Sequence, residues 1–235
     1  MPRQPRQFEI DGIYHVIKRG VEQRDIFLKP QDYHRFILGL EFCNTHTATN
    51  LWPLVGSDPT QLGGRLAEER AKKRTPLVEL LAFTLMPNHI HLILQETLQG
   101  GISKFMQKLG GYSTYFNKQY KRVGTLFQSH FKDVRIHDDI QLHNVFVYVH
   151  TNPVELWESG WKKFSVCNTD NAIQKLEQYW ASSYSDYIGK ENFPFVTTKD
   201  FFLKFFGDEQ KCRQAVEDWI RLKGGQANFD AKMFE

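Results

Sequence analysis

The chain has 235 residues, a formal net charge of +3 and 41% hydrophobic residues, including 19 Phe, so it can bury a sizeable core. No stretch reaches the roughly 18 apolar residues of a membrane span, and the first residues lack the apolar segment of a signal peptide. The odd number of widely spaced cysteines, Cys43, Cys167 and Cys212, supports neither a disulfide framework nor a C-x-x-C zinc site. We therefore expect a cytoplasmic protein without a membrane partner.

The first half of the chain predicts a strand, a helix and an insertion. Residues 13–20 are typical of a strand that ends at Gly20. Residues 30–43 carry apolar side chains at helical spacing, and Pro30 suits the first turn of that helix. Residues 44–76 then change to a polar, Pro- and Gly-containing composition followed by a charged run. We expect an exposed insertion there, partly helical near residues 66–73.

Two further strands and a helix follow the insertion. Residues 77–86 and 90–95 are rich in apolar and β-branched residues and are joined by Pro87 and Asn88, which predicts an antiparallel hairpin. Residues 102–119 have the spacing of a single helix. Three tyrosines in or just after that helix are expected to be structural: Tyr112, Tyr115 and Tyr120.

The predicted order of elements is that of a ferredoxin-like fold. Residues 127–136 predict the fourth strand, and residues 140–151 predict a helix that ends before Pro153. The order β-α-β-β-α-β followed by a helix indicates an α+β protein with a ferredoxin-like antiparallel sheet. We expect one domain over residues 1–160 and a C-terminal helical extension over residues 161–235, packed on the same domain.

His89 and His91 are separated by one residue within the third predicted strand. Side chains at i and i+2 leave the same face of a strand, so both imidazoles point one way, while Ile90 and Leu92 point into a core. Two imidazoles on a rigid strand form half of a metal site, which we expect to face a cleft. The alternative is a pair of exposed histidines on a solvated strand face. The other histidines, including His15 and His150, lack this spacing and are expected to be polar or DNA-facing.

Tyr148 and Asn152 lie four residues apart in the last predicted helix, so they share one helical face. A phenol and an amide oxygen can therefore approach the same point. The alternative is that Tyr148 is a half-buried core residue and Asn152 only ends the helix before Pro153.

A local excess of basic residues follows the histidine strand. Seven basic residues and one acid lie between residues 101 and 137, a balance that suits a phosphate backbone, although an exposed helix face is the alternative. The candidate DNA-binding residues are Lys104, Lys108, Lys118, Lys121, Arg122 and Lys132, together with Arg19 at the end of the first strand.

Five short sequences, in order, carry a family resemblance. They are YHVIKRG at residues 14–20, LMPNHIHL at 85–92, GTLFQSHFK at 124–132, YVHTNPV at 148–154 and WASSY at 180–184. Together they resemble the single-tyrosine HUH transposases, especially the REP-associated tyrosine transposases. The resemblance covers about residues 10 to 220, apart from the insertion.

The resemblance implies a nuclease that nicks single-stranded or hairpin DNA through a 5′-phosphotyrosine intermediate and then joins strands. By position, Tyr148 would be the nucleophile, and His89 and His91 would bind a divalent metal. Asn152 would complete the metal site, at a place where relatives often have Gln. Such ligands suit Mn²⁺ well and Mg²⁺ acceptably, and zinc would bind them too.

We therefore expect a DNA transposase that acts as a monomer or a homodimer. Two alternatives stay open. One is a non-catalytic nucleic-acid-binding protein on the same fold, and the other is a small metal-dependent phosphodiesterase with water as its nucleophile.

Overall fold

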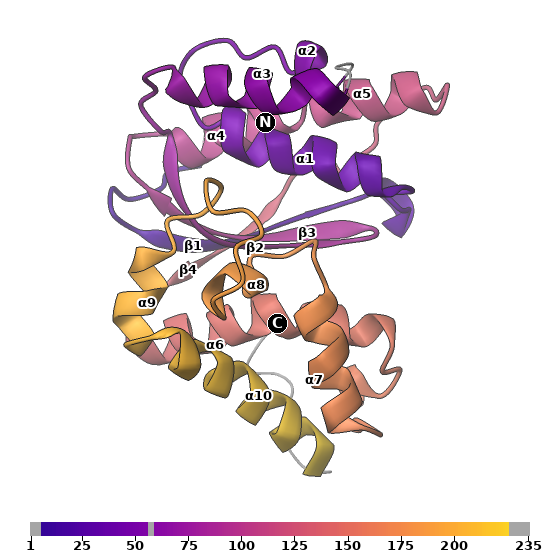
Figure 1. The fold of residues 1–235 in the computed structure, drawn as a ribbon, viewed down its shortest axis with the longest axis vertical. Coiled ribbons are helices and arrows are strands. Elements are labelled where there is room, and N and C mark those ends of the chain that lie inside the picture. Colours follow the sequence, from indigo (N-terminus) through magenta and orange to yellow (C-terminus); the bar gives the residue numbers. More distant parts are fainter. Residues whose placement is uncertain (1–5, 56–58, 226–235) are drawn as a thin grey trace.

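A four-stranded antiparallel sheet forms the centre of the computed structural model, which describes residues 6–55 and 59–225 (Figure 1). Its strands are β1 (Ile13–Arg19), β2 (Val78–Met86), β3 (His89–Glu96) and β4 (Lys132–Ile136). Their spatial order is β2-β3-β1-β4, with every neighbouring pair antiparallel, which confirms the predicted α+β, ferredoxin-like class. Because β3 pairs with both β2 and β1, the strand that bears the two histidines lies inside the sheet.

One face of the sheet is covered by helices from the first half of the chain (Figure 1). They are α1 (Pro30–Phe42), α4 (Gly101–Leu109) and α5 (Tyr112–Gln119), with α2 (Trp52–Val55) and α3 (Pro59–Ala71) farther from the sheet, and the short η1 (Val21–Gln23) follows β1. Val16, Ile90 and Leu92 of the sheet pack against Phe36 of α1 and Phe105 of α4 in one core. The strand side chains that alternate with these therefore point to the opposite face.

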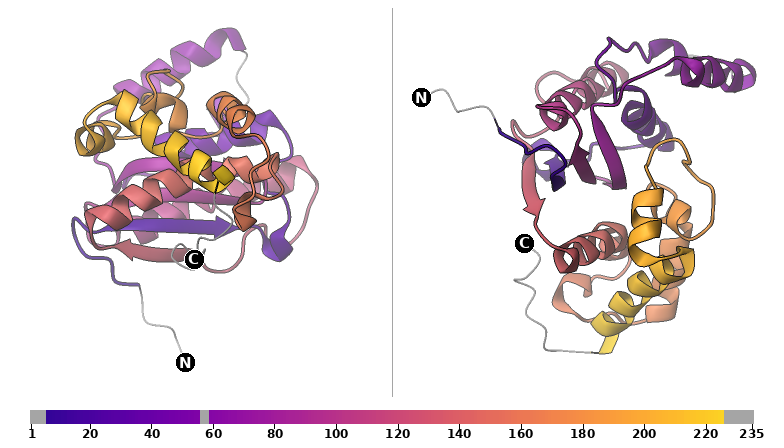
Figure 2. Two further views of the ribbon diagram at one scale, coloured as in Figure 1. Left: turned by 90° about the horizontal axis from the view of Figure 1, so that it is seen from below. Right: turned by 90° about the vertical axis from the view of Figure 1, so that its left-hand side faces the viewer.

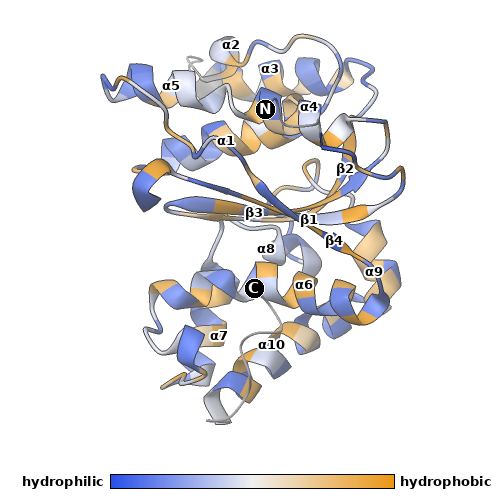
Figure 3. Cartoon of the chain, turned by 180° about the vertical axis from the view of Figure 1, so that it is seen from behind, coloured by the Kyte–Doolittle hydropathy of each residue, from blue (hydrophilic) through white to orange (hydrophobic). Residues whose placement is uncertain are grey.

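The opposite face carries α6 (Asp139–Thr151) and the C-terminal helices (Figure 2). These are η2 (Asn152–Leu156), η3 (Trp161–Lys163), α7 (Thr169–Gln178), α8 (Tyr184–Tyr187), α9 (Asp200–Phe206) and α10 (Glu209–Gly225). Ile93 of the sheet, Phe146 of α6 and Ile220 of α10 belong to this second core. Figure 3 shows hydrophobic segments in both helical layers. Over residues 6–55 and 59–225, none of the helices has both the length and the apolar character that crossing a bilayer requires.

Polar side chains cap the starts of two helices. The Asp138 carboxylate accepts a hydrogen bond from the Gln141 N–H at 2.7 Å, which caps α6. The buried Glu96 carboxylate accepts bonds from the N–H groups of Gly100, Gly101 and Ile102 at the start of α4. These caps fix the helices relative to the strands from which the chain enters them.

Three predicted elements differ from the structure. The single helix expected at residues 102–119 is interrupted at Gly110 and Gly111, because two adjacent glycines stabilise a helix poorly. The fourth strand begins at Lys132 instead of residue 127, since Phe127 turns into the first core and makes only an isolated bridge with Gly20. The insertion helix runs over Pro59–Ala71 instead of residues 66–73.

The insertion is only partly an exposed addition. The Asn44 side-chain oxygen accepts hydrogen bonds from the N–H groups of Leu77 and Val78, at 2.8 and 3.1 Å. Leu51 and Leu54 are buried in the first core. Residues 56–58 of the insertion, and residues 226–235 of the expected C-terminal extension, lie outside the described residues.

Candidate active site

The sheet places both predicted histidines on the face toward α6. Ile90 and Leu92 point into the first core, so His89 and His91 point the other way, with their ring centroids 4.8 Å apart. Arg19 of β1 lies directly opposite His89 and therefore shares this face. Both histidines are buried, His91 completely, so the expected open cleft is wrong. The second helical layer packs over this face of the sheet and shields them.

Helix α6 brings Tyr148 and Asn152 to the same point. The Tyr148 ring centroid lies 5.4 Å from that of His91, with the rings nearly perpendicular. Asn152 follows one turn later, where α6 ends, and its backbone N–H donates to the Tyr148 carbonyl. The Asn152 amide acts electrostatically on both His89 and Tyr148, and on each it opposes the effect of burial on the pKa. All four predicted residues of the chemical site thus lie in one cluster, in which Tyr148 is half-buried and the other three are buried.

Burial controls the protonation of this cluster. It lowers the pKa of His89 to about 4, reinforced by the positive charge of Arg19, and it lowers the pKa of His91 well below its usual range. Both imidazoles are therefore neutral at pH 7, the form that binds metal ions. Burial raises the pKa of Tyr148, while the Asn152 amide and the positive charges of Arg19 and Lys162 act in the opposite direction.

The residues in the cluster fit a divalent cation. His91 Nε2 and Asn152 Oδ1 are buried, and neither has a hydrogen-bond partner within the described residues. His89 Nδ1 lies 2.6 Å from Asn88 Oδ1, which leaves its Nε2 for a second partner. In the part of the chain that the structure describes, no three His, Cys, Asp or Glu side chains could together hold a metal. A metal bound here would therefore take Asn152 as its third protein ligand.

Two expectations for the other histidines are wrong. His15 is buried, and its Nε2 lies 2.9 Å from His91 Nδ1. His150 is also buried, with its Nε2 at 2.9 Å from Ser183 Oγ. The alternation of β1 could have placed His15 and Arg19 on one face. Nothing in the local sequence shows that β1 lies beside β3 in this register.

Charged residues surround the cluster, and of these the sequence analysis selected Arg19 but neither Lys162 nor Glu155. The Lys162 ammonium forms an ion pair with Glu155 at 2.8 Å, and both charges act on His89 and Tyr148. Arg19 Nε is buried and has no hydrogen-bond partner among the described residues. The site thus contains a guanidinium group that can donate hydrogen bonds to an anionic ligand.

The remaining candidate DNA-binding residues divide between the two faces of the sheet. The edge strand β4 (Figure 3) includes Lys132, which is exposed and pairs with Ile17 of β1, so it shares the histidine face. The others lie in or just after α4 and α5, in the layer on the opposite face: Lys104, Lys108, Lys118, Lys121 and Arg122. Within this layer, Lys108 Nζ donates to the backbone carbonyls of Thr45 and Thr47 at 2.5 and 2.6 Å. At least part of this group therefore holds protein segments together.

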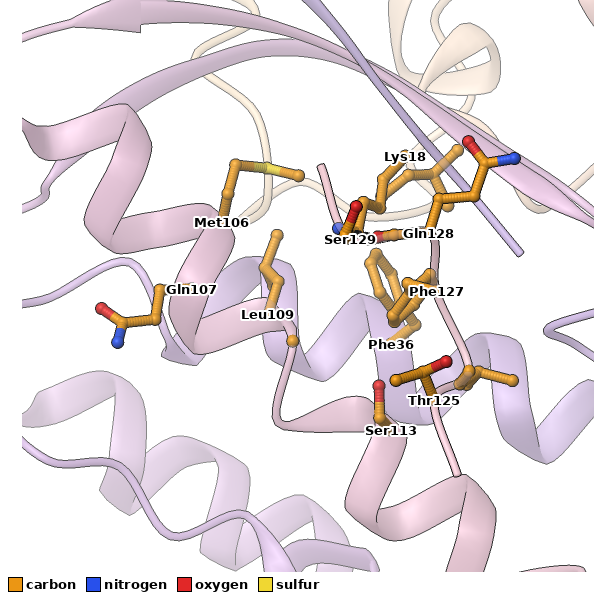
Figure 4. Close-up of a pocket in the computed structure, with 13 residues that line it drawn as sticks. Lys18, Phe36, Met106, Gln107, Leu109, Ser113, Thr125, Phe127, Gln128 and Ser129 are labelled. Atoms are coloured by element: carbon orange, nitrogen blue, oxygen red, sulfur yellow. Dashed lines mark hydrogen bonds between the residues drawn. The ribbon is translucent and has the colours of Figure 1, made fainter. Parts of the chain in front are cut away.

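The same layer contains a cavity of about 350 Å³ (Figure 4). Phe36, Met106 and Leu109 form apolar walls, and Phe127 and Gln128 close it from the segment after α5. Lys18 Nζ donates to the Gln128 carbonyl at 2.6 Å at this point. Lys18 and Arg19 are adjacent on β1, so their side chains point to opposite faces of the sheet. Lys18 lines the cavity and Arg19 shares the face of the histidines, so the cavity lies across the sheet from the histidines.

The three competing tyrosines lie away from the cluster. Tyr112 donates its hydroxyl hydrogen to the Ile26 carbonyl at 2.6 Å. Tyr120 and Tyr115 donate to the Asp32 carboxylate at 2.7 and 3.3 Å. These bonds join α5 to the segment around the start of α1, as expected for structural side chains.

Three comparisons with known proteins bear on the motif-based resemblance. No curated protein matches the chain. Among solved structures, one described as a REP-associated tyrosine transposase bound to a REP hairpin is similar, with a TM-score of 0.48 and 14% sequence identity. The similarity covers 83% of this chain and 90% of that one. A family model described as "Transposase IS200 like" matches residues 66–152. The resemblance to the IS200-like transposases is thus confirmed over residues 66–152, which include His89, His91, Tyr148 and Asn152.

Proposed function

We propose that this chain is a transposase that nicks and rejoins single-stranded or hairpin DNA through a 5′-phosphotyrosine intermediate, with Tyr148 as the nucleophile. The single observation that carries the proposal is that the half-buried Tyr148 lies beside two neutral imidazoles and Asn152. A purely structural role for His91 would leave its buried Nε2 unpaired, which costs free energy. A ligand role removes that cost.

The metal would be held by His91 and Asn152, whose buried Nε2 and Oδ1 lack partners among the described residues, together with the neighbouring His89. His91, His89 and Asn152 would bind Mg²⁺ or Mn²⁺, whose charge polarises and orients the scissile phosphate. The two histidines bind in their neutral forms, which burial maintains at pH 7. Their position on an interior strand keeps the ligands rigid.

In the proposed reaction the Tyr148 oxygen forms a bond to phosphorus as the bond to the 3′ oxygen breaks. Tyr148 loses its proton, and the released 3′ oxygen gains one. The new phosphotyrosine bond keeps the energy of the phosphodiester, so a different 3′ hydroxyl can attack it and join two strands. A water nucleophile would lose that energy through hydrolysis.

The charges around the cluster suit the DNA backbone. Arg19 is proposed to contact the scissile phosphate, since its Nε has no partner among the described residues and its charge acts on Tyr148. Lys132 is proposed to contact a neighbouring phosphate on the same face of the sheet. The basic residues of the α4–α5 layer, Lys104, Lys108, Lys118, Lys121 and Arg122, would form a second, more distant contact region. If about five phosphates are neutralised, log K for single-stranded DNA falls with log salt at a slope of about −3 to −4.

The test is a covalent adduct. The protein is incubated with 3′-labelled hairpin DNA and Mn²⁺, denatured, and examined for label that migrates with the protein. We expect an adduct with Mn²⁺, none with a chelator, and a loss of orders of magnitude in His91→Ala. His137→Ala is the matched control, because His137 is an exposed histidine just before α6.

An adduct of normal yield in His91→Ala would contradict the metal site. A wild-type protein that binds the DNA but forms no adduct, and cuts nothing, would favour the non-catalytic DNA-binding protein. Cutting without an adduct would favour the phosphodiesterase that uses water.

A further inference from the structure

We propose that His15 is a positioning residue that holds His91 in the tautomer able to bind a cation through Nε2. The inference rests on the proposed metal role of His91. It starts from one contact, the 2.9 Å separation of His15 Nε2 and His91 Nδ1, which joins two buried rings. No sequence motif connects these residues, which are 76 positions apart.

An N···N hydrogen bond contains one hydrogen, so one ring donates and the other accepts. If His91 donates from Nδ1, its Nε2 carries a lone pair. If His15 donates instead, the neutral His91 ring carries its hydrogen on Nε2. His91 Nε2 is buried and has no partner within the described residues, so a hydrogen there would be an unsatisfied donor. If His91 donates from Nδ1, its Nε2 lone pair remains free to bind a cation.

The geometry supports an in-plane hydrogen bond. The two rings are inclined by only 16°, and their centroids are 5.1 Å apart, well beyond the N···N distance. Two nearly parallel rings whose centroids are this far apart, and whose nitrogens are in hydrogen-bond contact, lie side by side and edge to edge. Rings stacked face to face would have closer centroids and no hydrogen bond between their nitrogens. In metal sites, a residue that hydrogen-bonds to a ligating histidine fixes the tautomer and the orientation of that histidine. His15 acts on His91 in this way.

The sheet holds this pair rigidly and links it to the nucleophile. β1 and β3 both lie inside the sheet, and His15 pairs with Ile93, two residues after His91. The His15 and Tyr148 ring centroids are 5.7 Å apart, with the rings inclined by 77°. One residue thus supports both a metal ligand and the ring of the proposed nucleophile.

Two substitutions separate positioning from packing. His15→Phe keeps a ring of similar shape beside Tyr148 but removes the acceptor, whereas the amide oxygen of His15→Gln can still accept from His91 Nδ1–H. We expect His15→Phe to weaken Mn²⁺ binding to the DNA-free protein by about 10- to 100-fold. His15→Gln should stay within a few fold of wild type. Mn²⁺ affinity is measured by electron paramagnetic resonance, and thermal unfolding is followed in parallel.

Wild-type Mn²⁺ affinity in His15→Phe would overturn the inference, as would equal weakening in both variants. A wild-type protein that binds no Mn²⁺ would instead refute the proposed function itself. If His15→Phe does not fold, nitrogen-15 NMR of the wild-type protein with Zn²⁺ decides the question. The hydrogen of His91 is expected on Nδ1, and finding it on Nε2 would overturn the inference.

Discussion

The nucleophile assignment predicts opposite behaviour for two tyrosines when each loses only its hydroxyl group. Tyr148→Phe removes an oxygen on which the Asn152 amide acts and keeps the ring packed against His91 and His15. A hydrogen bond contributes about 0.5–1.5 kcal/mol, so loss of this hydroxyl should cost the fold no more than about 1.5 kcal/mol. The covalent adduct should disappear entirely, because no other atom replaces the nucleophile.

Tyr112→Phe should show the reverse. Its hydroxyl donates to the carbonyl of Ile26, a fully buried residue, and the substitution leaves that acceptor unpaired. An unsatisfied buried polar group costs about 1–3 kcal/mol, so this variant should be the less stable of the two. Its adduct yield should equal that of the wild type, since Tyr112 lies in the helical layer across the sheet from the histidines.

Urea unfolding and the adduct assay with labelled hairpin DNA and Mn²⁺ are measured on the same preparations. An adduct that persists in Tyr148→Phe would refute the assignment. A large stability loss in Tyr148→Phe with little loss of adduct would show that Tyr148 is a core residue.

Three further predictions follow from burial, charge and position. Lys132→Glu should weaken the binding of single-stranded DNA and reduce the slope of log K against log salt by about 0.7 or more. Lys104→Glu, in the opposite layer, should have a smaller effect on both quantities. Anisotropy titrations at several salt concentrations measure this, and equal losses of affinity in the two variants would contradict the placement. Because burial raises the pKa of Tyr148, fewer than about one phenol in a thousand is ionised at pH 7, and the fraction grows with pH. Single-turnover adduct formation should therefore accelerate from pH 7 to 9, and a flat profile would argue against the phenolate as the reactive form. Leu51→Ala should cost about 2–5 kcal/mol in urea unfolding, because Leu51 is buried in the first core. Replacement of Pro59–Ala71 by a Gly-Ser linker should cost less, and a greater loss would show that α3 belongs to the core.

Local periodicity predicted which side chains of the candidate site lie together, because backbone geometry alone decides which neighbours share a face. His89 and His91 share a strand face at any register, and Tyr148 and Asn152 share a helix face in any fold. The two-residue connection Pro87–Asn88 predicted an antiparallel hairpin between the two strands that it joins. The order of elements indicated the ferredoxin-like sheet. These predictions depend on separations of a few residues, where the chain has few alternatives.

Only the tertiary structure decided what lies beside those residues. The contact between His15 and His91 requires β1 to lie next to β3 in one register, and a shift by a single residue would turn His15 to the other face. The division of Lys132 from Lys104 depends on which layer each element joins, which residue spacing does not encode. Burial of His91 depends on helices that follow it in the chain and pack over the sheet. Contacts between distant segments depend on strand order, register and layer packing, which arise from the summed packing of the whole chain.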